Sequence, residues 1–141
     1  MIINLTKKNI IAHRPITAIS FFERGRGMIG RRFDDFDAMI FNRCNSIHTM
    51  FMSIKIDVLF LNSENIICDF RKELVPWIPF VKVRNAQSVI ELPAGVIEKT
   101  EIEIGNCIDL NAELTAKQYQ ELKKQILSTP EVIVPIKDQV K

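Results

Sequence analysis

The chain has 141 residues, of which 47% are hydrophobic and 26% charged, and its formal net charge is +2 at pH 7. This length and composition are typical of one soluble globular domain and exclude a disordered tail or a fibrous protein. Because the net charge is small, the sequence predicts no binding to nucleic acid or to an anionic membrane surface.

The start of the chain and its cysteines favour a cytoplasmic protein. The apolar run at residues 1–5 is too short for a signal peptide, and its lysines follow that run instead of preceding it. No run approaches the ~20 apolar residues of a membrane-spanning helix. The three cysteines, Cys44, Cys68 and Cys107, lack the spacing of zinc ligands. We therefore expect reduced thiols, with no metal and no cofactor.

The first quarter of the chain predicts two short strands, a helix and a loop. Apolar residues at 1–5 and 9–13 flank a polar turn and indicate the strands. Apolar positions recur at helical spacing over 16–26, with Pro15 in the first turn, where its missing N–H has no partner to lose. The polar segment 31–37 is typical of a loop.

From residue 38 the pattern changes to short apolar runs separated by polar turns, which predicts strands. Residues 62–65 (NSEN) predict a hairpin loop, and residues 93–99 a short helix that begins at Pro93. The predicted strands lie at residues 39–41, 47–52, 54–61, 66–70 and 102–110, with one or two more within 81–92.

A third helix is predicted near the C-terminus, over about 115–128. Thr115 and Gln118 have capping-box spacing, an apolar stripe follows, and Pro130 ends the helix. We expect a mainly β (α+β) domain at residues 1–110, a small β-sandwich or barrel with two or three peripheral helices. The extension 111–141 would pack its helix on that body.

Residues 25–30 match GxGxxG literally, but the match does not predict dinucleotide binding. That site needs a strand before the glycines, a helix after them and an acidic residue ~20 positions on. Here a predicted helix precedes them, a polar loop follows, and residues 48–52 hold no acid.

Four arginines surround this glycine turn: Arg24, Arg26, Arg31 and Arg32. Guanidinium groups bind phosphate or carboxylate in bidentate fashion, so the turn is a candidate anion site. Nearby aspartates, Asp34, Asp35 and Asp37, could instead neutralise it. The aspartates lack the spacing and the distal glutamate of a calcium loop.

His48, Asp57 and Glu91 form the candidate acid–base set, because each lies within an apolar, strand-like run. A buried carboxylate without a partner is costly, so we expect these groups to converge. Converging groups could fix the register of the strands, line a ligand site or perform acid–base chemistry.

Trp77 is the only tryptophan, and Pro76 and Pro79 flank it. Prolines at this density belong at a sheet edge or in a loop. The ring could be a lid over the core or an exposed platform for stacking.

Taken together, these segments resemble the family known as domain of unknown function 192, over roughly residues 10–110. The matching stretches are 24–31 (RGRGMIGR), 38–41 (AMIF), 46–62 (SIHTMFMSIKIDVLFLN), 76–77 (PW), 89–95 (VIELPAG) and 105–106 (GN). Lys55, Met50 and Asn106 depart from the family pattern, in which a proline, an aromatic or small residue and an aspartate are usual.

The resemblance implies a compact mainly β domain with small helices and no established reaction, cofactor or substrate. It also implies that His48, Asp57, Trp77 and Glu91 are positions that the family motifs use.

We favour a non-enzymatic module that binds an unidentified small ligand or a protein partner. The candidate binding residues are Arg24, Arg31, His48, Thr49, Met52, Asp57, Trp77 and Glu91. The alternative is a small hydrolase or isomerase with His48 as base, Asp57 as its orienting partner and Glu91 as acid. A third possibility is an interaction subunit that docks through its C-terminal helix.

Overall fold

The computed structural model describes residues 1–113, 118, 120–121, 124 and 128. The predicted helix over 115–128 lies largely outside these residues, and so does most of the extension 111–141. The packing of that helix on the body therefore stays a prediction.

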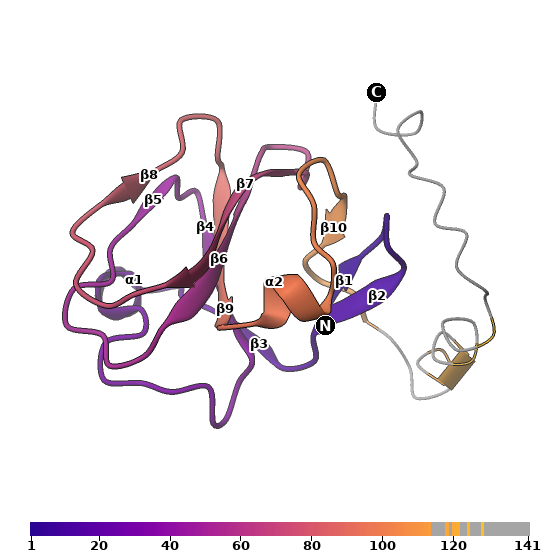
Figure 1. Cartoon of the computed structure of the whole chain (residues 1–141), viewed down its shortest axis with the longest axis horizontal. Helices are drawn as coiled ribbons and strands as arrows, with labels where there is room; N and C mark the ends of the chain where they lie inside the picture. Colours follow the sequence, from indigo (N-terminus) through magenta and orange to yellow (C-terminus); the bar gives the residue numbers. More distant parts are fainter. Residues whose placement is uncertain (114–117, 119, 122–123, 125–127, 129–141) are drawn as a thin grey trace.

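A five-stranded sheet forms the centre of the molecule (Figure 1). All its neighbouring strands run antiparallel except the first two, which are parallel. Its order is β3 (Pro15–Thr17), β4 (Ala38–Asn42), β9 (Ser88–Pro93), β6 (Ile56–Leu61) and β7 (Ile67–Leu74).

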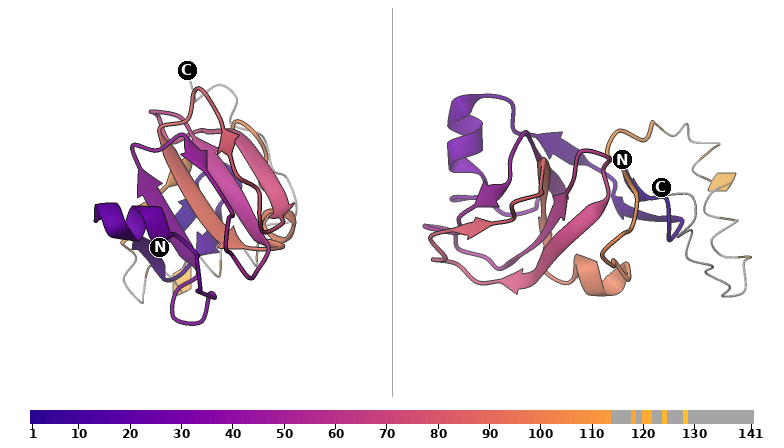
Figure 2. Two further views of the ribbon diagram at one scale, coloured as in Figure 1. Left: turned by 90° about the vertical axis from the view of Figure 1, so that its left-hand side faces the viewer. Right: turned by 90° about the horizontal axis from the view of Figure 1, so that it is seen from above.

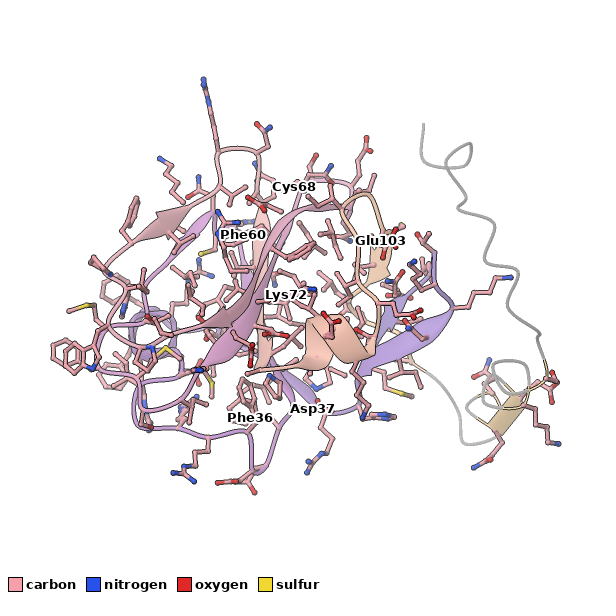
Figure 3. All side chains as sticks on the ribbon, viewed as in Figure 1. Phe36, Asp37, Phe60, Cys68, Lys72 and Glu103 are labelled. Atoms are coloured by element: carbon pink, nitrogen blue, oxygen red, sulfur yellow. The ribbon has the colours of Figure 1, made fainter. Side chains whose placement is uncertain are left out.

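The neighbouring inner strands β6 and β9 are buried on both faces. Successive side chains of a strand point to opposite faces, so Val58 and Phe60 enter one core cluster and Leu59 and Leu61 another. Figure 3 shows Phe60 within the packed body. This double burial explains why residues 56–61 form an almost continuous apolar run.

One face of the sheet is covered by β1 (Ile2–Asn4), β2 (Asn9–Ala12), β10 (Ile108–Asp109) and helix α2 (Val96–Lys99). We call it the α2 face. Apolar residues of these elements share a core cluster with Leu59 and Leu61.

The opposite face, which we call the β5 face, is covered by the pair β5 (Ser46–Ile47) and β8 (Val81–Lys82) and by residues after helix α1 (Phe21–Arg26). Figures 1 and 2 show β5, β8 and α1 at one end of the molecule and β1, β2 and β10 at the other.

The mainly β fold class is confirmed, but the barrel alternative is wrong. The described strands form three separate sheets of five, three and two strands. β3 and β7 are the two edges of the large sheet and do not pair with each other, so the sheet stays open.

The helix predicted over 16–26 begins five residues late. Residues 15–17 form edge strand β3 beside β4, and α1 begins at Phe21. Ser20 sets this start through a capping box with Glu23, in which each side chain accepts from the other residue's backbone N–H.

The 93–99 segment also differs from its prediction. Pro93 is the last residue of β9, and α2 begins only at Val96, after Gly95 with a φ of 96°. The strand predicted over 47–52 is limited to its first residue, because the chain turns after His48.

The hairpin loop predicted at 62–65 is confirmed. The Asn62 side-chain oxygen accepts the N–H groups of Glu64 and Ile66 and so closes the turn.

Asp57 fastens three segments on the α2 face. Its carboxylate accepts the backbone N–H of Glu73 at 2.8 Å, of Gly95 at 3.1 Å and of Ile97 at 2.8 Å. The side chain is buried, yet these bonds compensate its charge. They join β6 to an irregularity in β7 and to the turn that starts α2. Lys72 on β7 also reaches α2, with its Nζ 2.6 Å from Glu98 Oε2.

Replacing Asp57 by alanine is expected to lower the free energy of unfolding by about 3 kcal/mol or more, because three backbone donors lose their acceptor. Asp57→Asn keeps the side-chain volume but turns an NH₂ group toward N–H donors, so it should also destabilise. Urea denaturation measures both losses.

The matched control is Asp34→Ala at an exposed position, with an expected change within about 0.5 kcal/mol. If Asp57→Ala and Asp34→Ala have the same denaturation midpoint, the Asp57 carboxylate does not fasten these segments.

Candidate functional site

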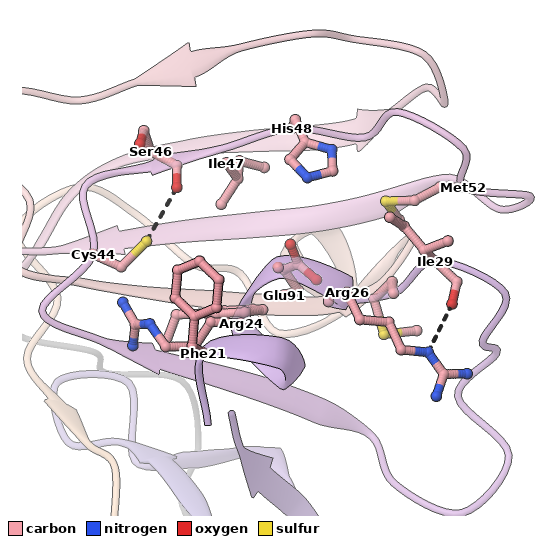
Figure 4. A pocket seen from close by; sticks show the side chains of 14 residues that line it. Phe21, Arg24, Arg26, Ile29, Cys44, Ser46, Ile47, His48, Met52 and Glu91 are labelled. Atoms are coloured by element: carbon pink, nitrogen blue, oxygen red, sulfur yellow. Dashed lines mark hydrogen bonds between the residues drawn. The ribbon is translucent and has the colours of Figure 1, made fainter. Parts of the chain in front are cut away.

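A pocket of about 250 Å³ opens on the β5 face (Figure 4). Glu91 of β9 and Phe41 of β4 lie at its sheet side, while α1 and the turn after it form one wall. His48 and Met52, from the segment after β5, line the opposite wall.

Glu91 is the polar group at the bottom of this pocket. It is 3% exposed, and its Oε2 atom has no hydrogen-bond partner among the described residues. Its register partners in the neighbouring strands are Met39 and Val58, which are apolar and buried. Because burial disfavours the charged form, the pKa of Glu91 is raised to about 8. The carboxyl group is therefore mostly protonated at neutral pH.

Gly27 keeps the space above Glu91 open. It ends α1 with a φ of +50°, a backbone conformation that L side chains rarely adopt. A Cβ atom at this position would lie 3.6 Å from Phe41 Cζ and 3.8 Å from Glu91 Oε2. The glycine turn that resembles a dinucleotide motif thus shapes a pocket at the end of a helix.

His48 faces Glu91 across the pocket, and its ring points inward in Figure 4. The Met50 N–H donates to Nδ1 of His48 at 3.2 Å. A neutral imidazole that accepts at Nδ1 carries its proton on Nε2, so His48 has one N–H donor left for another group.

Two arginines of α1 line the same pocket, but their guanidinium groups are held at its rim. Arg24 donates to the carbonyl oxygens of Asn42 at 2.6 Å and Arg43 at 3.3 Å. Arg26 Nε donates to the carbonyl oxygen of Ile29 at 3.2 Å. They contribute positive charge to the opening.

Arg31 does not line this pocket. The pKa of Glu23 is lowered mainly by the backbone N–H groups of Ser20 and Ile19, and the nearby Arg31 charge contributes less. Among the described residues, none of the four arginines forms a close ion pair with the aspartates of the loop, so neutralisation of the arginine turn stays a prediction. Asp37 instead accepts the backbone N–H groups of His13 and Arg14.

Thr49 and Trp77 belong to a neighbouring structure, outside the pocket lining. The buried Thr49 hydroxyl donates to the Val75 carbonyl oxygen at 2.7 Å and accepts the Ile78 N–H at 2.8 Å, which joins two loops. Trp77 is 58% exposed and contacts Phe51 edge-to-face. Trp77 is therefore no lid over the core. Both aromatic residues have positive φ, which is unusual for bulky side chains.

Asp57 and Glu91 do not converge, which corrects the expectation of one shared polar site. Asp57 is the register partner of Leu92 on the α2 face, whereas Glu91 pairs with Val58 on the β5 face. The sheet separates the two carboxyl groups, so Asp57 cannot orient His48. The acid–base triad of the hydrolase or isomerase alternative is therefore not formed.

Of the eight candidate binding residues, the pocket brings together Arg24, His48, Met52 and Glu91. Sequence reasoning missed Gly27 and Phe41, although the glycine turn is conspicuous in the sequence. No three His, Cys, Asp or Glu side chains are grouped as metal ligands in the described part of the chain. The described helices are also too short or too polar to cross a membrane.

Residues 4–110 match the model of the domain of unknown function 192 family, described as "Uncharacterized ACR". A UPF0127 protein of Thermococcus sibiricus is 37% identical over 119 residues, which are 80% of this chain and 76% of that protein. A UPF0127 protein of Pyrococcus furiosus is 34% identical over 113 residues, 77% of this chain and 97% of that protein.

A solved structure has a similar fold. The crystal structure of a protein of unknown function from Novosphingobium aromaticivorans matches with a TM-score of 0.61 and 19% sequence identity. The match covers 67% of this chain and 73% of the other.

Gly27→Ala is expected to lower the free energy of unfolding by about 1 kcal/mol or more, since alanine strains at this φ. Gly25→Ala is the matched control. Gly25 lies within α1, and a Cβ atom added there would have nothing within 4 Å, so alanine should stabilise the helix by about 0.5–1 kcal/mol. Thermal denaturation measures the melting temperatures of both variants. If both melt above wild type, or both below it, the positive φ assigned to Gly27 is contradicted.

The titration of Glu91 predicts a pH-dependent stability. Between its ordinary value of 4.5 and the folded value of about 8, the unfolded chain releases a proton that the folded chain retains. The free energy of unfolding should therefore fall by about 1.4 kcal/mol per pH unit in this range, and level off above it.

Glu91→Gln removes this titration. The free energy of unfolding of the variant should therefore rise relative to that of wild type as the pH increases from about 5 to about 8. Urea denaturation at several pH values measures the difference. Glu64→Gln, at an exposed position, should follow the wild-type curve. A constant difference between Glu91→Gln and wild type over this range would mean that Glu91 titrates normally.

Proposed function

Since this chain belongs to the domain of unknown function 192 family, whose description names no activity, we propose its function from its own pocket: it is a small-ligand-binding module. The ligand site is the pocket between α1, His48 and Glu91. The observation that carries this proposal is the buried Oε2 atom of Glu91, which lacks a hydrogen-bond partner among the described residues.

The free-energy cost of a buried polar atom without a hydrogen-bond partner supports a ligand beside Glu91. A buried polar atom without a partner costs about 1–3 kcal/mol, and nearly all such atoms in folded proteins find one. On the other face of the sheet, Asp57 has three backbone donors. A bound molecule would supply the missing partner to Glu91.

The size and lining of the pocket limit the ligand. Its volume of about 250 Å³ is smaller than the roughly 300–1,000 Å³ typical of pockets for drug-sized molecules. Met28, Phe41 and Met52 provide apolar surface beside the polar pair Glu91 and His48. This arrangement suits a small molecule with one polar end and an apolar body.

A non-enzymatic role agrees with the arrangement of the ionisable groups. The triad of the enzymatic alternative requires Asp57 beside His48, and the sheet lies between them. Binding needs only the groups that already line the pocket.

The test is a protein NMR titration of the full chain with a set of small acids, amides and amines. Binding in this pocket should shift the backbone amide signals of Gly27, His48 and Glu91 most. Gly27→Ala places a methyl group over Glu91 and should abolish these shifts, whereas Gly25→Ala should preserve them. Shifts scattered over the surface, or unchanged in Gly27→Ala, would contradict the proposal.

A further inference from the structure

We infer, on the premise of the proposed ligand site, that the ligand is a small organic acid whose carboxylate binds between Glu91 and His48. Its apolar body would contact Met28, Met52 and Phe41, which line the same pocket.

The hydrogen-bonding state of the two polar residues favours an acceptor. His48 accepts at Nδ1 from the Met50 N–H, so its Nε2 is left as a donor. Glu91 is buried between apolar register partners, which favours the neutral acid with its own O–H donor. Two donors that face one space require an acceptor between them, and a carboxylate offers two oxygen atoms.

A ligand carboxylate would also supply the hydrogen-bond partner that Glu91 lacks among the described residues. Two carboxyl groups in contact share a single proton in a short, strong hydrogen bond, because they cannot both be ionised at close range. The anionic ligand would therefore raise the proton affinity of Glu91 further, and Glu91 would discriminate against binding once it loses its proton.

The charges around the pocket favour an anion over a cation. Arg24 and Arg26 of α1 lie at the rim, and Cys44 and His48 are the other titratable residues of the lining. The strands beside Glu91 contribute only Met39 and Val58 at its register positions. An ammonium group would meet the positive rim and the Nε2 proton, and it would have to remove the proton of Glu91.

The experiment measures the binding of three probes of similar size by NMR titration: isovalerate, isovaleramide and isoamylamine. Isovalerate is ionised throughout a range from about pH 6.5 to about pH 9.5. Its affinity for wild-type protein should fall by about tenfold per pH unit above the pKa of Glu91, and by at least about tenfold over the whole range. At the lower pH, isoamylamine should bind at least about tenfold more weakly than isovalerate.

Glu91→Gln provides the control for the shared proton. Its side-chain NH₂ group donates to a carboxylate at every pH, so isovalerate should still bind, and the fall in affinity that the loss of the Glu91 proton causes in wild type should be absent. Lys55→Gln, outside the pocket lining, should retain the wild-type pH dependence.

The outcomes separate this inference from the proposed function. If isoamylamine binds better than isovalerate and gains affinity with rising pH, the pocket binds cations and the inference is wrong while the ligand site stands. If isovaleramide binds as tightly as isovalerate at the lower pH, the carboxylate is not recognised and the inference is again wrong. If none of the three shifts the amides of Gly27, His48 and Glu91, both fail.

Discussion

The burial of β6 and β9 on both faces is the constraint from which the rest of the structure follows. Each of these neighbouring strands carries one carboxyl group. Every side chain of the two strands is buried or partly buried. Since successive residues point to opposite faces, the pairing of Asp57 with Leu92 and of Val58 with Glu91 places the two acids back to back. Each face must therefore accommodate a buried carboxyl group by itself.

The two faces accommodate their buried carboxyl groups in different ways. Asp57 has a structural role, whereas Glu91 belongs to the proposed ligand site. On the α2 face, three backbone N–H groups satisfy Asp57, and the same bonds position α2. On the β5 face, Glu91 lies in an apolar setting, with an oxygen that no described residue contacts by a hydrogen bond, beside a pocket. Gly27 keeps that pocket open, and His48 directs a second polar group into it. A buried polar group without a hydrogen-bond partner lowers the stability of the fold, and such local costs are expected at ligand-binding sites.

Sequence patterns predict the fold better than the site. The short apolar runs predict most of the strands, and the polar segment 62–65 predicts its hairpin loop. The apolar run around Asp57 and Glu91 reveals that both are buried, but it does not reveal the register between their strands, and register alone decides which face each occupies. His48 and Glu91 converge because β5 folds over the sheet, a tertiary contact without a local signal. Helix α1 begins later than predicted because the capping box at Ser20 outweighs the helical spacing of Ile16.

The protonation of Glu91 is the central claim, and NMR observes it directly. The side-chain carboxyl carbon of Glu91, labelled with ¹³C, reports its own titration in the full chain. We predict a midpoint near 8 for Glu91, well above the ordinary glutamate value of 4.5. A midpoint for Glu91 at that ordinary value would show an ionised, solvated group, and it would remove the basis for the ligand site and for the shared proton.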